Sequence, residues 1–159
     1  MRYHDITKDD MRNGPGLRAV LWVSGCEHHC PGCHNPVTWD PEDGLEFNDF
    51  ARKELLEILG RDYISGLTLS GGDPLYPGNR SEITELCHQV KSRFPNKSIW
   101  LYTGYDYEEV KSLSLMRDID VVVDGRFMMD LADIKLHWRG SSNQRVIDVS
   151  TGRDITDLC

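Results

Sequence analysis

The sequence predicts an α/β fold in which helices pack along a parallel sheet. Short apolar runs rich in β-branched or aromatic residues recur along the chain, and segments with helical apolar spacing separate them. Glycines follow most of these runs closely, as turns between strands and helices require. The chain has 159 residues, enough for one packed core, so we expect a single domain over residues 1–159 with a loosely ordered polar tail from about residue 150.

Four segments are predicted to be strands. They are Arg18–Ser24, Gly66–Ser70, Ser98–Thr103 and Asp120–Asp124. Strands that alternate with helices form parallel sheets through right-handed crossovers, so all four are expected to point the same way. The loops that follow parallel strands gather at one edge of the sheet, where α/β proteins bind their ligands. The residues that follow these strands are therefore expected to meet in one place.

Three segments are predicted to be helices. Their apolar positions are Phe50, Leu55, Leu56 and Leu59 in the first, Ile83, Leu86, Cys87 and Val90 in the second, and Val110, Leu113 and Met116 in the shorter third. Gly60 suits the position just past the end of the first helix. Asn79 and Glu82 stand three residues apart and predict a capping box for the second helix, which Pro95 would end. Asp106 is the expected N-cap of the third helix.

The composition narrows the class of protein. Lys and Arg total 18 against 26 Asp and Glu, and the net charge of −8 weighs against nucleic acid as the main partner. No apolar run approaches the ~20 residues that span a bilayer, so no membrane partner is expected. The first residues, "MRYHDITKDD", lack the apolar stretch of a secretory signal, and a cytoplasmic location is expected. Disulfides are uncommon there, so clustered cysteines indicate metal or redox chemistry.

The segment "GCEHHCPGCHNP", residues 25–36, holds three of the five cysteines of the chain. Cys26, Cys30 and Cys33 follow the pattern C-x3-C-x2-C directly after the first predicted strand. A structural zinc site with these thiolates would need a fourth ligand. The candidates for that ligand are His28, His29 and His34.

An iron–sulfur cluster with four thiolate ligands would need another cysteine. Cys87 lies in the apolar stripe of its helix and is expected to be an inert buried thiol, while Cys159 lies on the tail. A third arrangement leaves one iron of a four-iron cluster open. Cys26, Cys30 and Cys33 would bind three irons, and a substrate would bind the fourth. Open coordination of this kind is typical of catalytic metal sites.

This third arrangement resembles the site of the radical S-adenosylmethionine enzymes, which carry C-x3-C-x2-C after the first strand of an α/β sheet. In them the amino and carboxylate groups of S-adenosylmethionine chelate the open iron. That superfamily usually has an aromatic residue just before the third cysteine, where this chain has Gly32.

The chain is more similar to the glycyl-radical activating enzymes of anaerobic ribonucleotide reductase. The shared blocks are "NGPG", "VSGC", "CPGC", "TW", "LSGGDPLYP", "WLYTGY", "VVVDGRF" and "WRGSSNQR", which extend over most of the chain. That family has an aromatic residue and Asn after "CPGC", and this chain has His34 and Asn35 there.

The resemblance implies roles for individual residues. The cluster ligands would be Cys26, Cys30 and Cys33, and no catalytic residue beyond them is implied. The S-adenosylmethionine contacts would come from the backbone of Gly32, Cys33 and His34 and from Gly71, Gly72 and Asp73. Carbonyls of the glycine pair would accept hydrogen bonds from the methionyl ammonium, and Asp73 would add negative charge beside it.

Further predictions concern two more strand ends, two arginines and the histidines near the first two cysteines. Thr103–Tyr105 and Asp124–Arg126 also end strands, and they could shape the adenosine end of the pocket or receive a partner protein. Arg139 and Arg145 could serve partner docking or surface solvation. His28 and His29 are expected on a solvated loop.

The resemblance also implies the fold and the reaction. The chain is too short for a complete eight-unit barrel of ~250 residues, so the sheet would be a truncated βα barrel with the cluster at its C-terminal strand edge. A reduced [4Fe-4S] cluster would pass one electron to S-adenosylmethionine, releasing methionine and a 5′-deoxyadenosyl radical. That radical would take a hydrogen atom from a glycine of the large reductase subunit. A small electron-transfer protein such as a flavodoxin would supply the electron.

Two alternatives remain open from the sequence. "NGPG", "CHN" and "TWD" also resemble activators of other glycyl-radical enzymes such as pyruvate formate-lyase, although those chains are considerably longer. The other alternative is a non-catalytic, zinc-stabilised binding module, which would leave "GGDPL" without a function. Metal analysis separates this module from the cluster protein, because the first would hold zinc and the second iron with sulfide.

Overall fold

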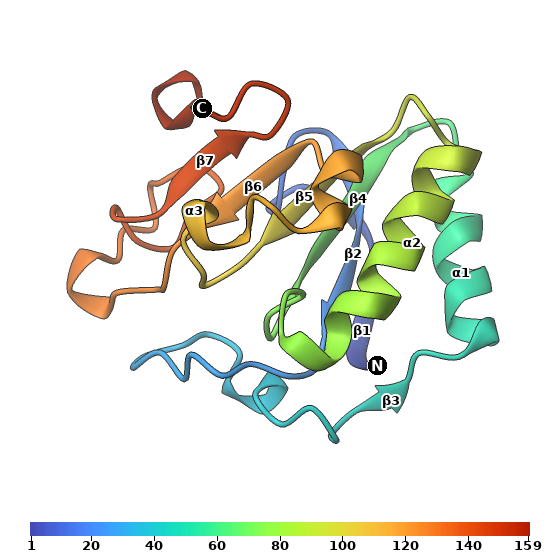
Figure 1. Cartoon of the computed structure of the whole chain (residues 1–159), viewed down its shortest axis with the longest axis horizontal. Coiled ribbons are helices and arrows are strands. Elements are labelled where there is room, and N and C mark those ends of the chain that lie inside the picture. The colour runs from blue at the N-terminus through green and yellow to red at the C-terminus, as the bar shows by residue number, and fades with distance from the viewer.

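The computed structural model describes all 159 residues and contains an eight-stranded sheet (Figure 1). The strands are β1 Arg2–Asp10, β2 Leu17–Val23, β3 Leu45–Glu46, β4 Ile64–Gly71, β5 Ser98–Tyr102, β6 Val121–Asp124, β7 Arg145–Asp148 and β8 Arg153–Asp154. The α-helices are α1 Asp49–Leu59, α2 Arg80–Arg93 and α3 Tyr107–Val110. Short 3-10 turns occupy Pro36–Thr38, Pro77–Asn79, Ser114–Asp118, Met129–Leu131 and Thr156–Leu158.

The four predicted strands are confirmed as β2, β4, β5 and β6. They are mutually parallel and adjacent in the sheet, whose order is β3-β1-β2-β4-β5-β6-β7-β8. The expectation that every strand points the same way is wrong for the whole sheet, because β1 and β7 pair antiparallel with its parallel centre. The sequence of β1, "RYHDITKDD", is so polar that it gave no strand signal, and only Tyr3 and Ile6 of it are buried.

The helices cover one face of the sheet. Parallel strands in simple chain order with right-handed crossovers place successive helices on the same side, and Figure 1 shows α1 and α2 together there. The main core lies between this face and the helices. It is formed by residues such as Leu21, Leu69 and Leu101 of the strands and Leu55 and Leu86 of the helices. No helix has both the length and the apolar character that crossing a bilayer requires.

Two details of the predicted helices are wrong. Phe50 is 85% exposed, because it precedes the stripe that α1 turns toward the sheet, which begins at Ala51. Asn79 stands at the N-cap of α2 but makes no capping hydrogen bond. Its side-chain amide instead donates to the carbonyl of Ser24 (2.7 Å), and Glu82 pairs with the amino terminus. The predicted apolar stripe of α2 is confirmed as buried.

The third predicted helix is interrupted. Asp106 is the N-cap of α3, as expected, and its backbone N–H donates to the Glu109 carboxylate (2.8 Å). The helix ends at Val110, and the chain forms a separate 3-10 turn that buries Met116. The connection to β6 is therefore one short helix followed by a 3-10 turn and not one continuous helix.

The opposite face of the sheet is the inner wall of a pocket. Side chains alternate between the two faces along each strand, so Trp22, Ser70, Tyr102 and Val123 fall on this inner face. The register aligns Trp22 with Ser70 and Tyr102 with Val123. These four residues form one row near the carboxyl ends of the parallel strands, and all four line the pocket.

A buried arginine closes the inner face below this row. Arg18 on β2 is fully buried and forms no ion pair, and burial lowers the pKa of its guanidinium to about 10. The guanidinium donates to the hydroxyls of Thr68 and Ser98 (both 2.9 Å) and to three backbone carbonyls. The "NGPG" block packs over it, since a Cβ on Gly14 would lie 2.8 Å from its side chain.

Arg18→Ala is expected to lower the free energy of unfolding by about 3–5 kcal/mol, because it leaves a cavity and several unpaired buried acceptors. Urea unfolding of the cluster-free protein measures the loss. Arg93→Ala, which removes an exposed arginine of α2, is the matched control and should cost less than about 1 kcal/mol. Equal, small losses in the two variants would contradict this account of Arg18.

Candidate metal centre

A pocket of about 640 Å³ opens where the parallel strands end. The row on the inner face described above forms its floor. Of the residues singled out in the sequence, Cys26, Cys30, Cys33, His34, Gly71, Gly72 and Asp73 line it. Gly32 is not part of the lining. Residues far apart in the chain thus meet at the sheet edge that the topology predicts.

The cysteine segment is held against the sheet by its backbone. The N–H groups of Gly25 and Cys26 donate to the carbonyls of Thr38 (2.8 Å) and Trp39 (3.1 Å), so the segment folds back on itself. The N–H of Asp73 donates to the carbonyl of Gly25 (2.7 Å). The segment is therefore tied directly to the turn that follows β4.

Gly72 is required by this close approach. A Cβ there would lie 2.5 Å from the carbonyl oxygen of Gly25 and 2.8 Å from that of Thr38. No real Cβ packs so near a backbone oxygen. The position must stay glycine because of the cysteine segment behind it, whatever its carbonyl contributes to the pocket.

The three cysteines are half-buried, and backbone amides approach the sulfurs of Cys26 and Cys33. Burial raises the pKa of the Cys26 thiol, while hydrogen bonds from the backbone N–H groups of His28 and His29 act in the opposite direction. The N–H of Asn35 donates to the sulfur of Cys33 (3.4 Å). Amides aimed at the sulfurs stabilise thiolates and the negative charge of a reduced cluster.

The thiols also differ in arrangement from the ligands of a single ion. No three His, Cys, Asp or Glu side chains converge as they would around one metal ion. The irons of a four-iron cluster lie at separate corners, and each thiolate binds its own iron. Three half-buried cysteines that line one pocket, two of them with amides at their sulfurs, fit such a group.

Asp73 joins three loops at the pocket. Its carboxylate is buried and accepts hydrogen bonds from the N–H of Leu75 (2.8 Å), the hydroxyl of Thr103 (2.9 Å) and the N–H of Gly104 (2.9 Å). The fourth contact is Nε2 of His28 at 2.7 Å. The loops after β2, β4 and β5 therefore share one carboxylate.

The expectation that His28 lies on a solvated loop is wrong. Its side chain is only 3% exposed, and its ring packs edge-on against Tyr105 with centroids 4.5 Å apart. A Cβ on Gly104 would come within 2.4 Å of the ring, so the glycine of "TGY" makes room for it. The sequence places two histidines, His28 and His29, between the first two cysteines, but it does not indicate a partner for either. His29 is exposed, as expected.

An ion pair organises the far side of the pocket. Asp124 is buried, and its carboxylate accepts from the N–H of Tyr107 (2.7 Å) and from Arg145 (2.5 Å). Arg145 also pairs with Glu108 (2.8 Å), and the two carboxylates raise the pKa of its guanidinium. Arg145 therefore holds α3 and β7 together. Arg139 is likewise occupied, donating to the carbonyls of Ser142 and Gln144.

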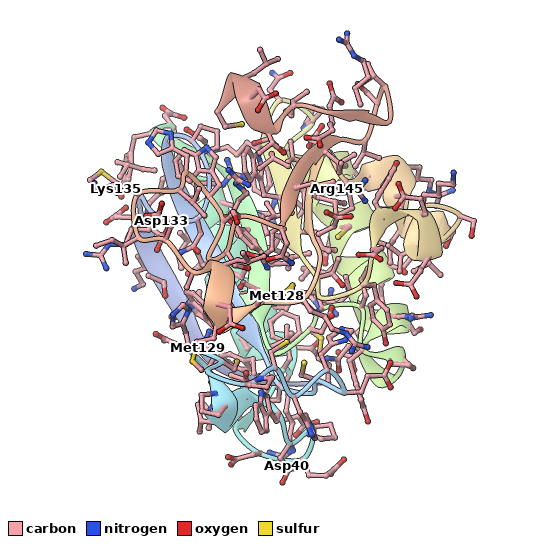
Figure 2. The ribbon with its side chains drawn as sticks, turned by 90° about the vertical axis from the view of Figure 1, so that its left-hand side faces the viewer. Asp40, Met128, Met129, Asp133, Lys135 and Arg145 are labelled. Carbon is pink, nitrogen blue, oxygen red and sulfur yellow. The ribbon has the colours of Figure 1, made fainter.

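The segment 125–144 forms the outer wall. In Figure 2 it runs past the labelled Met128 and Met129 toward Asp133 and Lys135, beside the pocket. Met129 packs on the cysteine segment, since a Cβ on Gly32 would lie 2.6 Å from its sulfur. Four apolar side chains of the segment 125–144 are exposed. The exposed fraction is 48% for Met128, 60% for Met129, 40% for Leu131 and 103% for Ile134. The wall next to the thiols thus exposes apolar side chains among charged ones.

The chain matches one protein family and is similar to several named proteins. Residues 12–147 match the family model of a 4Fe-4S single cluster domain. The anaerobic ribonucleoside-triphosphate reductase-activating protein of Enterobacteria phage T4 is 51% identical over 146 residues, which cover 92% of this chain and 93% of that protein. Proteins of the same name are 43% identical in Escherichia coli (strain K12), over 92% of this chain and 97% of that one, and in Vibrio cholerae, over 91% and 96%.

Asp73→Asn is expected to destabilise the cluster-free protein by about 2–4 kcal/mol, because an amide cannot accept from all four donors and leaves at least one unpaired. Urea unfolding measures the loss. Asp62→Asn, at an exposed position, should stay within ~0.5 kcal/mol of the parent protein. The shared-carboxylate account fails if both variants unfold like the parent.

Gly72→Ala is expected to cut the iron and sulfide content sharply, since the added Cβ pushes the cysteine segment away from the turn after β4. Gly60→Ala is the control, because its Cβ would meet no atom nearer than 3.5 Å. Iron and sulfide are assayed after anaerobic purification. Full cluster content in the Gly72 variant would show that the segment tolerates displacement.

Proposed function

The chain belongs to the 4Fe-4S single cluster domain family and to the anaerobic ribonucleoside-triphosphate reductase-activating proteins, and from this membership we propose that it activates anaerobic ribonucleoside-triphosphate reductase as a radical S-adenosylmethionine enzyme. The resemblance in the sequence blocks is confirmed at the level of the family. The observation that carries the proposal is the single pocket on which the three cysteines and Gly71–Asp73 meet.

The winding of the sheet supports a partial barrel of the radical S-adenosylmethionine type. The parallel strands β2, β4, β5 and β6 follow one another in chain order, without the reversal of a doubly wound sheet. Their inward side chains form rows, as in the interior of a βα barrel. The antiparallel strands at both edges leave the barrel incomplete, and the pocket opens on the inner side.

The chain's own residues would hold the two cofactors. Cys26, Cys30 and Cys33 would bind three irons of a [4Fe-4S] cluster and leave the fourth for S-adenosylmethionine. The carbonyls of Gly71 and Gly72 and the backbone at Gly32, Cys33 and His34 would contact its methionyl group. Asp73 would act mainly by fixing the loops, because its oxygens already accept four internal hydrogen bonds.

When bound, the cluster would supply one electron to the sulfonium, breaking the C5′–S bond to give methionine and a 5′-deoxyadenosyl radical that takes hydrogen from a glycine Cα. The protein's part is to orient the reactants and to exclude water. The floor formed by Trp22, Tyr102 and their neighbours is largely apolar and backed by the buried Trp100 cluster. Such walls limit the side reactions of a radical.

The glycine would belong to the large subunit of the reductase that the relatives are named for activating. The electron would come from a small carrier such as a flavodoxin, and the setting would be the cytoplasm. The chain would act as a single domain, whose tail from about residue 150 could order further on the partner. The pyruvate formate-lyase and zinc-module alternatives gain no support from these relatives, whose names all specify the reductase.

Replacing each cysteine with alanine tests the ligand set. Cys26→Ala, Cys30→Ala and Cys33→Ala should each lose most of the bound iron and sulfide. Cys87→Ala should keep both, because Cys87 is fully buried in the core and burial raises the pKa of its thiol. Cys159→Ala should keep both as well. If Cys87→Ala loses iron as completely as Cys30→Ala does, the three-cysteine site is wrong.

The function is tested by mixing the reduced protein and S-adenosylmethionine with a candidate partner in the absence of oxygen. Electron paramagnetic resonance should show a glycyl doublet on the large subunit of anaerobic ribonucleotide reductase, with 5′-deoxyadenosine released. Pyruvate formate-lyase in a parallel reaction should give no doublet. A doublet only on pyruvate formate-lyase would reverse the partner, and no 5′-deoxyadenosine in either reaction would refute the chemistry.

A further inference from the structure

Exposed apolar side chains concentrate beside the pocket that holds the three cysteines. Ten large apolar residues of the chain are exposed, and four of these ten lie within seven consecutive residues: Met128, Met129, Leu131 and Ile134. We call these four residues the rim patch. Single exposed apolar residues are ordinary, but a group of them on one segment is typical of a site that binds another molecule.

The rim patch belongs to the wall of the pocket. Ile134 lines the pocket together with Ala132 and Asp133. The side chain of Met129 lies against the cysteine segment at Gly32. Figure 2 labels Met129 and Asp133 on this wall. A molecule that enters the pocket from this side therefore passes over the patch.

The backbone behind the rim patch is held in place by the block "WRGSSNQR". The N–H of Ser142 donates to the carbonyl of Leu131 (2.9 Å), and the N–H of Met128 donates to the hydroxyl of the fully buried Ser141 (3.1 Å). Arg139 in turn donates to the carbonyl of Ser142 (3.1 Å). The block therefore fixes the backbone of the segment, while the apolar side chains of the patch stay exposed to water.

The charges on this segment favour neither sign of partner. Between residues 126 and 135 it carries two basic and two acidic side chains, which are Arg126, Lys135, Asp130 and Asp133. Their formal charges cancel. Burial of apolar surface is then the main force available for docking, and screening by salt affects it little.

The proposed reaction acts on a glycine of a protein, and this determines what can cover the patch. Glycine has no side chain by which a site could recognise it, so the residues beside it in the partner must make the contacts. The rim patch offers apolar contacts to those neighbouring residues, and its two methionines can adapt to an irregular surface. A protein segment with apolar residues beside its glycine therefore fits the patch.

We propose that the rim patch binds the glycine-bearing segment of the large subunit of anaerobic ribonucleotide reductase, through apolar residues beside that glycine. This inference rests on the proposed function. Docking there brings the glycine over the pocket, on the side where Ile134 borders it. The patch residues position the partner, and none of them takes part in bond cleavage.

Two truncations test the patch: Leu131→Ser and Ile134→Ser, singly and together. Phe50→Ser is the matched control, because Phe50 is 85% exposed on α1, which covers the opposite face of the sheet. All proteins are purified anaerobically with the cluster in place. Isothermal titration calorimetry measures the dissociation constant for the large subunit without S-adenosylmethionine or reductant. Iron and sulfide assays verify the cluster, and sedimentation gives the oligomeric state of the protein alone.

Each truncation should weaken binding of the large subunit about tenfold, as expected for an apolar anchor at an interface, and Phe50→Ser should bind like the parent. Raising sodium chloride from about 0.05 M to about 0.5 M should change the dissociation constant of the parent by less than about threefold, because apolar docking is little screened.

Unchanged affinity in the double variant with a full cluster would overturn the rim patch as the docking site. An equal loss in Phe50→Ser would overturn it too, since the effect would not be local. If Leu131→Ser lowers the iron content, Ile134→Ser decides alone, because its fully exposed side chain can be removed without a cavity. A parent dimer that the double variant converts to a monomer would assign the patch to a second copy.

The proposed function fails separately from this inference. If the parent forms a glycyl radical on the large subunit and the patch variants bind that subunit normally, only the docking site is wrong. If the parent neither binds the large subunit nor releases 5′-deoxyadenosine when reduced with S-adenosylmethionine, both the proposed function and the docking site are wrong.

Discussion

The carboxylate of Asp73 is the contact on which the site depends. A buried carboxylate is costly unless its oxygens are paired, and this one accepts hydrogen bonds from four donors. The donors come from the cysteine segment, from the turn after β4 and from the loop after β5. Each loop could adopt other conformations alone. Because all three loops bond to the Asp73 carboxylate, they are held in the arrangement in which the cysteines face the Gly71–Gly72 turn.

Close backbone packing makes the same arrangement rigid. Gly72 allows the turn after β4 to contact the cysteine segment, and Gly104 allows His28 to lie under the loop after β5. On the other side of the pocket, Arg145 ties β7 to Asp124 at the end of β6. The two faces of the sheet thus have separate tasks. One packs on α1 and α2 as the core, and the other lines the pocket that holds the three cysteines.

The sequence predicted most of the central fold and the location of the site, for identifiable reasons. The parallel strands are rich in apolar, β-prone residues and give a strong signal, and their common direction brings the following loops together. The strand β1 was missed because it is largely polar, and the Asn79 cap was wrong because its amide has a better partner in the Ser24 carbonyl. His28 was misplaced because its burial depends on Asp73, 45 residues away in the chain. No local pattern reports a pairing over that separation.

The central claim is that S-adenosylmethionine binds directly to the one iron that has no cysteine ligand. Electron–nuclear double resonance on the reduced protein tests this claim most directly. The cosubstrate would carry nitrogen-15 in its amino group and oxygen-17 in its carboxylate. Direct binding at the open iron predicts hyperfine coupling of both nuclei to the cluster spin when the cosubstrate is saturating. The absence of coupling from either nucleus, with the cosubstrate bound and the cluster intact, would contradict the open-iron site.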